Sequence, residues 1–345
     1  MFKLENFIRE NVKLMKAYSS ARDDFTDVAE VYLDANENPF DNGINRYPDP
    51  YQKKLKERIS EIKSISTKNI MLGNGSDEVL DLIFRAFCEP NRDNAIFTPP
   101  TYGMYKVLAE LNNVNLKPSY LDVNFDFRAD ELLNQIDPNT KLILLCSPNN
   151  PSGNSIKEVQ VKKILDRSNC LVVIDEAYID FSNKNSYIDL LSIYPNLIVC
   201  QTLSKAWGMA GIRLGICYAS DAIISVLNKI KPPYNVNVLT QQKAIESIEN
   251  IENFNSNLEE ILKEKKKLKV ALGKIGFVKL IYPSDANFWL IKVDDANMRY
   301  KQLLKEGIVV RNRTNEILCE NCLRITVGTA KENEKLIKAL KELQS

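Results

Sequence analysis

The chain has 345 residues, which is enough for one large domain or two of ordinary size. Its 46 Lys and Arg residues nearly balance 45 Asp and Glu, so the net charge of +1 gives no electrostatic reason to expect nucleic acid or an anionic membrane as a partner. No apolar run approaches the roughly 20 residues that span a bilayer, and the charged N-terminal segment lacks the apolar region of a signal peptide. We therefore expect a cytoplasmic protein with an ordinary buried core.

The sequence contains no histidine and seven cysteines. Without histidine, Ser-His-Asp and Cys-His catalytic units are excluded, and proton transfer would fall to Lys, Asp, Glu, Tyr or Cys. The odd number of scattered cysteines does not resemble a disulfide framework. Cys319 and Cys322 form a C-x-x-C pair, but no second pair stands at zinc-ribbon spacing. We interpret both as ordinary reduced thiols and predict no metal site.

Short apolar runs without two-residue alternation recur in the first two thirds of the chain. Such runs are typical of strands covered on both faces. They lie at Ile70–Leu72, Asn94–Thr98, Lys141–Cys146, Leu171–Asp175 and Leu197–Thr202. Apolar residues at helical spacing predict helices between them, at Asp77–Cys88 and Lys157–Leu165. The alternation of strands and helices over residues 30–230 predicts an α/β fold with a mostly parallel sheet.

The pattern changes near Lys231-Pro232-Pro233-Tyr234. A long charged helix is expected at Ile251–Leu272, with its lysine run on a solvated face. Strands at Asn287–Val293 and Leu323–Val327, a helix at Met298–Glu306 and a last helix then predict a smaller α+β unit. We accordingly predict an N-terminal arm at residues 1–29, a large domain at 30–231 and a small domain at 232–345.

Polar residues that follow the predicted strands are the first candidates for a site, because ligands of open parallel sheets bind beyond the carboxyl ends of the strands. Lys205 stands just past one strand, where a low dielectric would lower its pKa and favour a Schiff base with an aldehyde. Thr202, Ser204 and Arg213 offer donors for a phosphate. A helix-opening serine followed by two surface cations explains the same spacing equally well.

Asp175 ends a buried strand, where a carboxylate needs a partner. A protonated pyridine nitrogen would be such a partner and would keep the ring able to accept electrons. A metal-binding aspartate or a capped loop is the alternative, whereas the absence of a G-x-x-x-x-G-K-[ST] segment argues against a P-loop NTPase. The segment Gly73–Glu78 precedes a helix and offers backbone donors for an anion, although its likeness to a dinucleotide fingerprint is faint.

Several segments stand in one order along nearly the whole chain. They are R-Y-P-D-P at 46–50, G-N-G-S-D-E at 73–78, P-P-T-Y-G-M-Y at 99–105, N-N-P-S-G at 149–153, D-E-A-Y at 175–178, S-K-A-W-G-M-A-G-I-R at 204–213 and L-R-I-T-V-G-T at 323–329. Together they resemble the fold-type I aminotransferases of class II, which depend on pyridoxal 5′-phosphate (PLP). The resemblance implies a large α/β domain with helices on both sides of its sheet, a smaller α+β domain, and PLP as the cofactor.

The resemblance also implies roles for individual residues. Lys205 would be the Schiff-base lysine and proton shuttle, and Asp175 would pair with the pyridine nitrogen. Tyr178 and Asn150 would hold the phenolic oxygen, and Tyr102 would stack on the ring. The cofactor phosphate would be held by the backbone N–H groups of Ser76 and Asp77, by Thr202, Ser204 and Arg213, and by Tyr47 of a neighbouring subunit. The last of these implies a homodimer.

Three further segments resemble the family members that act on histidinol phosphate: Y-S-S-A-R at 18–22, L-D-A-N-E-N-P-F at 33–40 and A-F-C-E-P at 86–90. Tyr18, Arg311 and Arg324 match the positions that bind substrate anions in the family. Arg324 alternates with Leu323 and Ile325, so its side chain should face away from theirs. An exposed arginine at a sheet edge is the alternative interpretation.

This resemblance implies transamination between L-histidinol phosphate and 2-oxoglutarate, giving imidazole acetol phosphate and L-glutamate. Three other functions stay open. An aminotransferase for aromatic amino acids would share the fold, the cofactor and Lys205. A PLP-dependent decarboxylase of a phosphorylated amino acid would share the scaffold, and a non-catalytic binding protein would retain only the fold.

Overall fold

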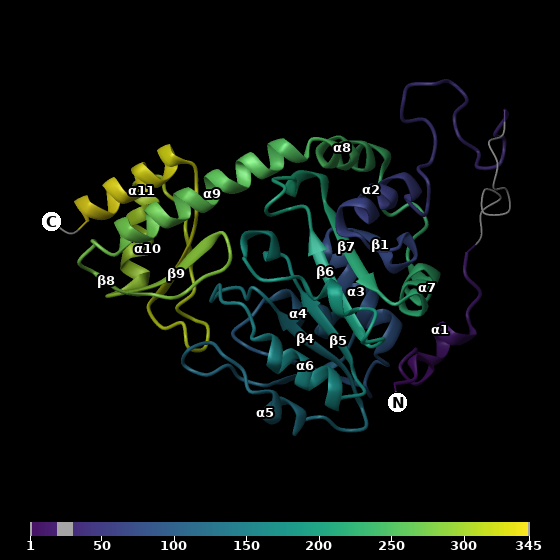
Figure 1. Cartoon of the computed structure of the whole chain (residues 1–345), viewed down its shortest axis with the longest axis horizontal. Coiled ribbons are helices and arrows are strands. Elements are labelled where there is room, and N and C mark those ends of the chain that lie inside the picture. The colour runs from purple at the N-terminus through teal and green to yellow at the C-terminus, as the bar shows by residue number, and fades with distance from the viewer. Residues whose placement is uncertain (1, 19–29, 344–345) are drawn as a thin grey trace.

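The computed structural model describes residues 2–18 and 30–343 and shows two units joined by a long helix (Figure 1). The larger unit contains a seven-stranded sheet of order β1-β7-β6-β5-β4-β2-β3. Its strands are β1 (Ile70–Asn74), β2 (Asn94–Phe97), β3 (Asn115–Pro118), β4 (Thr140–Cys146), β5 (Leu171–Asp175), β6 (Leu197–Thr202) and β7 (Leu214–Ala219). Within this sheet only β7 pairs antiparallel, with β6 on one side and β1 on the other. The predicted mostly parallel α/β sheet is confirmed.

Helices cover both faces of this sheet. In β5, Val172 and Ile174 enter the core on one face, whereas Leu171 and Val173 enter the core on the other. This explains why the run is apolar throughout and does not alternate. The first face is covered by α2 (Lys53–Lys63), α5 (Ala129–Leu133), α6 (Glu158–Arg167) and α8 (Val238–Glu249), and the second by α3 (Ser76–Phe87), α4 (Met104–Leu111) and α7 (Asp221–Ile230), with α1 (Glu10–Leu14) beside α7.

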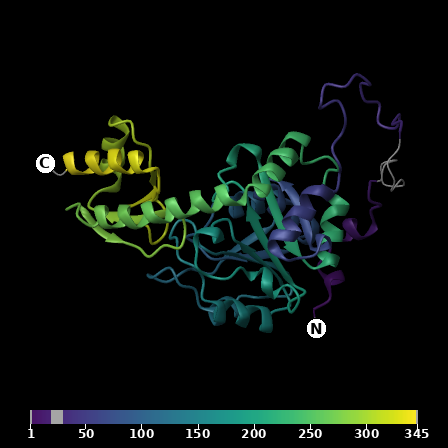
Figure 2. The same cartoon turned by 45° about the horizontal axis from the view of Figure 1, so that its top comes forward.

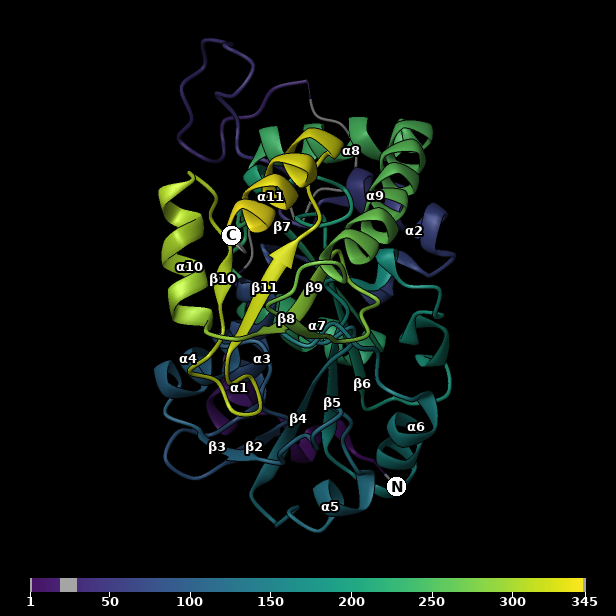
Figure 3. The ribbon, with the colours of Figure 1, turned by 90° about the vertical axis from the view of Figure 1, so that its left-hand side faces the viewer.

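The smaller unit is an antiparallel sheet of order β10-β11-β9-β8 packed against helices (Figure 3). Its strands are β8 (Val278–Ile281), β9 (Phe288–Val293), β10 (Arg311–Asn312) and β11 (Cys322–Thr326), and its helices are α9 (Ile251–Leu272), α10 (Ala296–Lys305) and α11 (Ala330–Glu342). Trp289 and Ile325 of the sheet share one core with Leu268, Leu303 and Leu336 of the three helices. Figure 2 shows α9 running from α8, beside the large sheet, to the small one.

The lysine run of α9 departs from expectation at Lys265. Its side chain is buried, its Nζ donates to the carbonyl oxygen of Ser284 at 2.7 Å, and it lies 5.1 Å from the ring centroid of Trp289. Burial lowers the pKa of Lys265 to about 8. The prediction of a solvated face is therefore wrong at this position, because the helix turns Lys265 toward β9.

The predicted domain division remains a prediction. Within residues 232–345, α8 packs against α2 of the large unit, and Ala244 and Ile248 enter the core of the large sheet. Residues 1 and 19–29 of the predicted arm, including residues 19–22 of the segment Y-S-S-A-R, lie outside the described residues. None of the helices in the described ranges is long and apolar enough to cross a membrane.

Candidate active site

One edge of the large sheet gathers most of the predicted site residues. The parallel strands β1, β4, β5 and β6 all end there, and the antiparallel strand β7 begins there, so residues far apart in the sequence meet. The strand β2 ends at the same edge. The residues that end or follow these strands or precede β7 are Ser76, Asp77, Tyr102, Asn150, Asp175, Tyr178, Thr202, Ser204, Lys205 and Arg213. This is the arrangement expected of a ligand site in an open α/β sheet.

A close approach between β7 and the start of α3 shapes the first part of the site. A Cβ atom on Gly215 would lie 2.3 Å from the backbone nitrogen of Ser76, so only glycine allows β7 to pass so near. Gly75 has a φ of +80° and donates its N–H to the carbonyl oxygen of Arg213 at 2.9 Å. Because no side chain caps α3, the first N–H groups of the helix are available to an anion.

Hydroxyl groups and a guanidinium lie next to this helix start. Thr202 Oγ1 lies 3.0 Å from Ser204 Oγ and donates to the carbonyl oxygen of Leu214 at 3.1 Å, which places both hydroxyls beside the start of β7. Arg213 Nη2 lies 3.8 Å from Asp77 Oδ2. Backbone amides, two hydroxyls and one guanidinium form a set of donors that fits a phosphate group.

Asp175 is held at the end of β5 with only 3% of its surface exposed. The hydroxyl of Tyr105 donates to Oδ2 at 2.9 Å, and the N–H of Ala177 donates to Oδ1 at 3.1 Å. Burial raises the pKa of Asp175 to about 6 although both hydrogen bonds oppose it. Among the described residues no cation forms an ion pair with Asp175, so a protonated pyridine nitrogen would be a suitable partner.

Lys205 and Tyr178 lie together beside Asp175. Lys205 Nζ is 5.6 Å from the ring centroid of Tyr178. Loss of hydration, followed by the charge of Arg324, lowers the pKa of Lys205, while Asp175 acts in the opposite direction. The ring of Tyr178 meets Phe288 of β9 edge-on at 5.3 Å. Lys205 therefore lies close to the contact between Tyr178 of the large unit and β9 of the small sheet.

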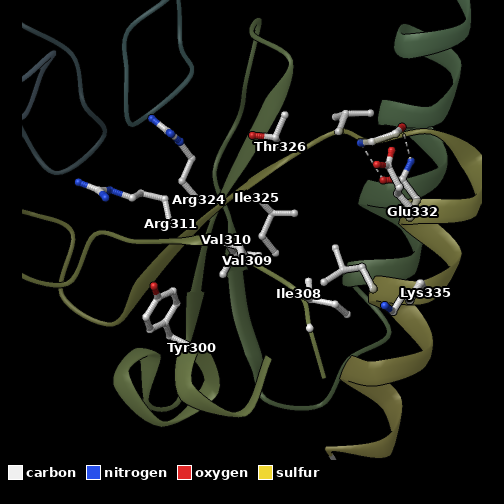
Figure 4. A pocket seen from close by; sticks show the side chains of 15 residues that line it. Tyr300, Ile308, Val309, Val310, Arg311, Arg324, Ile325, Thr326, Glu332 and Lys335 are labelled. Carbon is white, nitrogen blue, oxygen red and sulfur yellow. Dashed lines mark hydrogen bonds between the residues drawn. The ribbon is translucent and has the colours of Figure 1, made fainter. Parts of the chain in front are cut away.

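Arg311 and Arg324 come from the small sheet, where they are register partners on β10 and β11. Figure 4 shows both guanidinium groups extending to the same side, away from Ile308 and Ile325, and Leu323 and Ile325 are buried in the core behind them. The predicted orientation of Arg324 is thus confirmed. Its Nη1 donates to Asn150 Oδ1 of the large unit, whereas its buried Nε has no partner among the described residues.

A cavity of about 800 Å³ opens next to these arginines (Figure 4). The strands β10 and β11 pair over only two residues, and the segments 307–310 and 325–328 line the cavity beyond that pairing. Val309 on one wall is 80% exposed. The substrate-anion candidates therefore lie at an open part of the small unit.

Tyr18 and Tyr47 are placed differently. Both side chains are exposed, and the two described segments that carry them, residues 10–18 and 30–52, lie at the end of the molecule opposite to the small sheet (Figure 1). Tyr47 stacks on Tyr234 with ring centroids 4.4 Å apart. A single chain therefore does not bring these two predicted residues to Arg311 and Arg324.

Two residues of the site have no role in the sequence-based prediction. Tyr105 stands three positions after Tyr102 in P-P-T-Y-G-M-Y, a spacing that places both on one side of a helix start. Arg313 stands two positions after Arg311, as in an extended segment that presents both to one face. It is 9% exposed, pairs with Glu316 at 2.6 Å, and has a buried Nε without a partner among the described residues.

Both cysteines of the C-x-x-C pair are buried, and they belong to the same hydrophobic core as one face of the large sheet. Burial raises the pKa of Cys319 to about 12 and that of Cys322 to about 11. A raised pKa disfavours the thiolate form that reacts or binds metals, in agreement with ordinary reduced thiols.

Known proteins resemble this chain over nearly its whole length. The family model described as aminotransferase class I and II matches residues 17–340. A histidinol-phosphate aminotransferase from Flavobacterium psychrophilum is 59% identical over 99% of this chain and 99% of its own, and one from Christiangramia forsetii is 58% identical over 100% and 99%. The crystal structure of the histidinol-phosphate aminotransferase from Clostridium acetobutylicum matches with a TM-score of 0.81 and 27% identity, covering 87% of this chain and 91% of that one. This chain belongs to the class I and II aminotransferases, whose cofactor is pyridoxal 5′-phosphate.

Proposed function

We propose that this aminotransferase exchanges the amino group between L-histidinol phosphate and 2-oxoglutarate, giving imidazole acetol phosphate and L-glutamate, as a step in the synthesis of histidine. The observation that carries the proposal is the pair Arg311 and Arg324, which extends from adjacent strands to one side and faces the edge that holds Lys205. A guanidinium binds a phosphate and a planar carboxylate equally well. The names of the most similar relatives support the same substrate.

The cofactor fits the edge of the large sheet through the donors described above. Arg213, Thr202, Ser204 and the first N–H groups of α3 would bind its phosphate, and Asp175 would hold the proton on its ring nitrogen. Tyr178 and Asn150 would donate to its phenolic oxygen, and Tyr102 would lie against its ring. When bound, PLP supplies an aldehyde that takes up the amino group and a ring that accepts electrons from the substrate Cα.

Lys205 has the central part in proton transfer. Its Nζ would hold the cofactor through the aldehyde and would serve as the base that takes the proton from the substrate Cα. Its lowered pKa increases the fraction of neutral amine, which is the form that accepts a proton. Because the chain has no histidine, no imidazole competes for this role.

Arg311 and Arg324 would orient the two substrates in turn. The buried Nε of Arg324, which lacks a partner in the described part of the chain, would be satisfied by the arriving anion. In one half-reaction this anion is the phosphate of histidinol phosphate, and in the other it is the distal carboxylate of glutamate or 2-oxoglutarate. A shared anion site of this kind predicts ping-pong kinetics.

We further propose a cytoplasmic homodimer with shared active sites. The segment that carries Tyr47 exposes large apolar side chains, with Val31 at 70%, Leu33 at 89% and Phe40 at 80% exposure. Contact with a second copy would cover them and would bring Tyr47 to the partner's cofactor phosphate. The seven buried free thiols agree with a reducing compartment.

A substrate panel on the PLP-loaded protein tests the proposal. Histidinol phosphate should be converted with 2-oxoglutarate at a kcat/KM on the order of a hundred times that of phenylalanine, because the side chain of phenylalanine has no anion to pair with Arg311 and Arg324. A preference for phenylalanine would identify an aminotransferase for aromatic amino acids instead. Release of carbon dioxide without a keto acid would identify a decarboxylase, and the lack of a visible absorbance band after addition of PLP would identify a binding protein.

A further inference from the structure

Asp175 accepts hydrogen bonds from neutral donors only, although the nearby charge of Lys205 also favours its ionised form. Its two oxygens accept hydrogen bonds from Tyr105 and from the backbone of Ala177, and no cation forms an ion pair with it in residues 2–18 and 30–343. The hydrogen of the neighbouring thiol, Cys146, is donated to the carbonyl oxygen of Pro148 at 3.4 Å. Among residues 2–18 and 30–343, Tyr105 is therefore the one residue that donates a side-chain hydrogen bond to Asp175.

Tyr105 is itself held firmly in place. It lies in the first turns of α4 with 1% of its surface exposed, in the core between α3, α4 and the sheet. Its ring meets the ring of Tyr102 edge-on, with centroids 5.7 Å apart. Loss of hydration, followed by the charge of Asp175, raises the pKa of Tyr105 well above its usual range. The hydroxyl therefore keeps its proton at neutral pH and can donate a hydrogen bond to Asp175.

We propose that Tyr105 is a positioning residue that keeps Asp175 ionised and turned toward the cofactor ring, so that the ring nitrogen stays protonated. Tyr105 and Ala177 each occupy one oxygen from the protein side, which leaves the remaining lone pairs of the carboxylate for the ring N–H. Tyr105 acts only through Asp175, and this inference rests on the proposed binding of PLP at the sheet edge.

The physical reason is the balance of free energy at a buried carboxylate. A charge without hydration must be stabilised by hydrogen bonds, and a hydrogen bond to a charged group is stronger than one between neutral groups. Removing one of two donors shifts the shared proton from the ring nitrogen toward Asp175. The titratable groups around Asp175 that bear on this balance are Asp77, Tyr102, Tyr105, Cys146, Tyr178, Cys200 and Lys205.

The test uses Tyr105→Phe, which removes the hydroxyl and keeps the ring. The holoenzyme is loaded with PLP labelled with 15N in the ring, and the 15N chemical shift reports whether that nitrogen carries a proton. We expect the shift of the variant to move toward that of a neutral pyridine, and kcat to fall about tenfold with little change in KM. In the cofactor-free protein, the infrared band of the protonated Asp175 carboxyl should persist to higher pH than in the parent protein.

Tyr218→Phe is the matched control. Tyr218 is fully buried in β7, and its hydroxyl has no hydrogen-bond partner in the described part of the chain. Its loss should leave the 15N shift and the carboxyl band unchanged. If Tyr105→Phe does not fold, 3-fluorotyrosine placed at position 105 replaces it, and this stronger donor should move the carboxyl band to lower pH.

The outcomes separate this inference from the proposed function. An unchanged 15N shift and carboxyl band in the Tyr105 variants would overturn the inference, while the parent enzyme would still convert histidinol phosphate. Failure of the parent protein to bind PLP would overturn the proposed function, whereas the carboxyl band of the cofactor-free protein would still report on the hydrogen bond between Tyr105 and Asp175.

Discussion

The edge of the large sheet carries Asp175, and one face of the small sheet, here called the arginine face, carries Arg311 and Arg324. The two regions differ in how many of their polar groups already have hydrogen-bond partners within the protein. At the large-sheet edge, Asp175 accepts hydrogen bonds on both oxygens. On the small sheet, Arg313 and Arg324 each have a buried Nε without a partner among the described residues, and Arg311 is exposed. Under the proposed function, the end that would hold the cofactor is therefore formed before its ligand binds, whereas the end that would hold the substrate is completed by its ligand.

This difference follows from what each end must do. A resident cofactor presents the same groups at all times, so its donors can be held permanently in place. Under the proposed function, two substrates with different anions would use the arginine face in turn, and donors that lack protein partners would accept either. The predictions below test this comparison, beginning with the largest expected effect.

Lys205→Ala should reduce turnover by at least about 10⁴-fold, because proton transfer at Cα loses its base. Binding of PLP should persist, since the phosphate donors of the large-sheet edge are already in place. Steady-state kinetics and the absorbance of the bound cofactor measure the two effects. Lys106→Ala, which changes an exposed lysine of α4, is the control. Normal turnover of Lys205→Ala would show that the chemistry lies elsewhere.

Arg324→Gln should lower kcat/KM about a hundredfold for both histidinol phosphate and 2-oxoglutarate, because a charge-assisted hydrogen bond to each anion is lost. Affinity for PLP should change little. Equal losses for the two substrates would support a shared anion site. A loss for only one of them would mean that the two anions bind at separate places.

Asp175→Asn should stabilise the cofactor-free protein at pH 8 by about 3 kcal/mol, apart from its effect on turnover. The pKa of Asp175 is about 6 in the folded state and 3.8 at its ordinary value, so the folded state binds this proton more tightly. The free energy of unfolding therefore falls as the pH rises from about 4 to about 6. In the variant, this contribution to the pH dependence of stability should be absent. Urea unfolding across this range measures it.

Glu176→Gln, which changes the neighbouring buried carboxylate, is the variant to compare with Asp175→Asn. Burial raises the pKa of Glu176 to about 7, but its oxygens accept hydrogen bonds from Ser186, Tyr187 and Gln201. Its replacement should flatten the pH dependence of stability and leave PLP bound as before. Loss of PLP in this variant would contradict the view that only Asp175 serves the cofactor.

Arg313→Gln should raise KM for both dianions about threefold, the smallest effect in the series. Its guanidinium already pairs with Glu316, so only its free Nε contributes to the arriving anion. Glu316→Gln, which frees Arg313, should lower KM by a similar factor. Unchanged KM in both variants would limit the anion site to Arg311 and Arg324.

The parts of the fold with local signals could be predicted from the sequence. The bounds of β5, β6 and α9 agree with the prediction. The two strands are marked by apolar runs and the helix by its helical spacing, and both signals come from residues close together in the sequence. The strand β3 lacks an apolar run, and β10 has only two residues, so neither gives such a signal. Their existence depends on pairing with β2 and β11.

The same distinction holds for the site. Lys205, Asp175 and Arg213 were predictable because ligand residues follow strand ends, and the resemblance to a family added their roles. The contacts between them were not, because the hydrogen bonds from Tyr105 to Asp175 and from Arg324 to Asn150 join segments far apart in the chain. Such contacts depend on how the strands are ordered in the sheet, which local patterns do not encode.

The pairing of β1 with β7 also orders events during synthesis. The strand β1 ends at Asn74, but the strand that supports it begins only at Leu214 and is flanked by β6 on its other side. A nascent chain leaving the ribosome must therefore keep β1 and the turn at Gly75 unpaired until well over half of the protein has emerged. Chain fragments that stop before β7 should neither capture PLP nor resist proteolysis at this turn, so the cofactor can stabilise only a late intermediate.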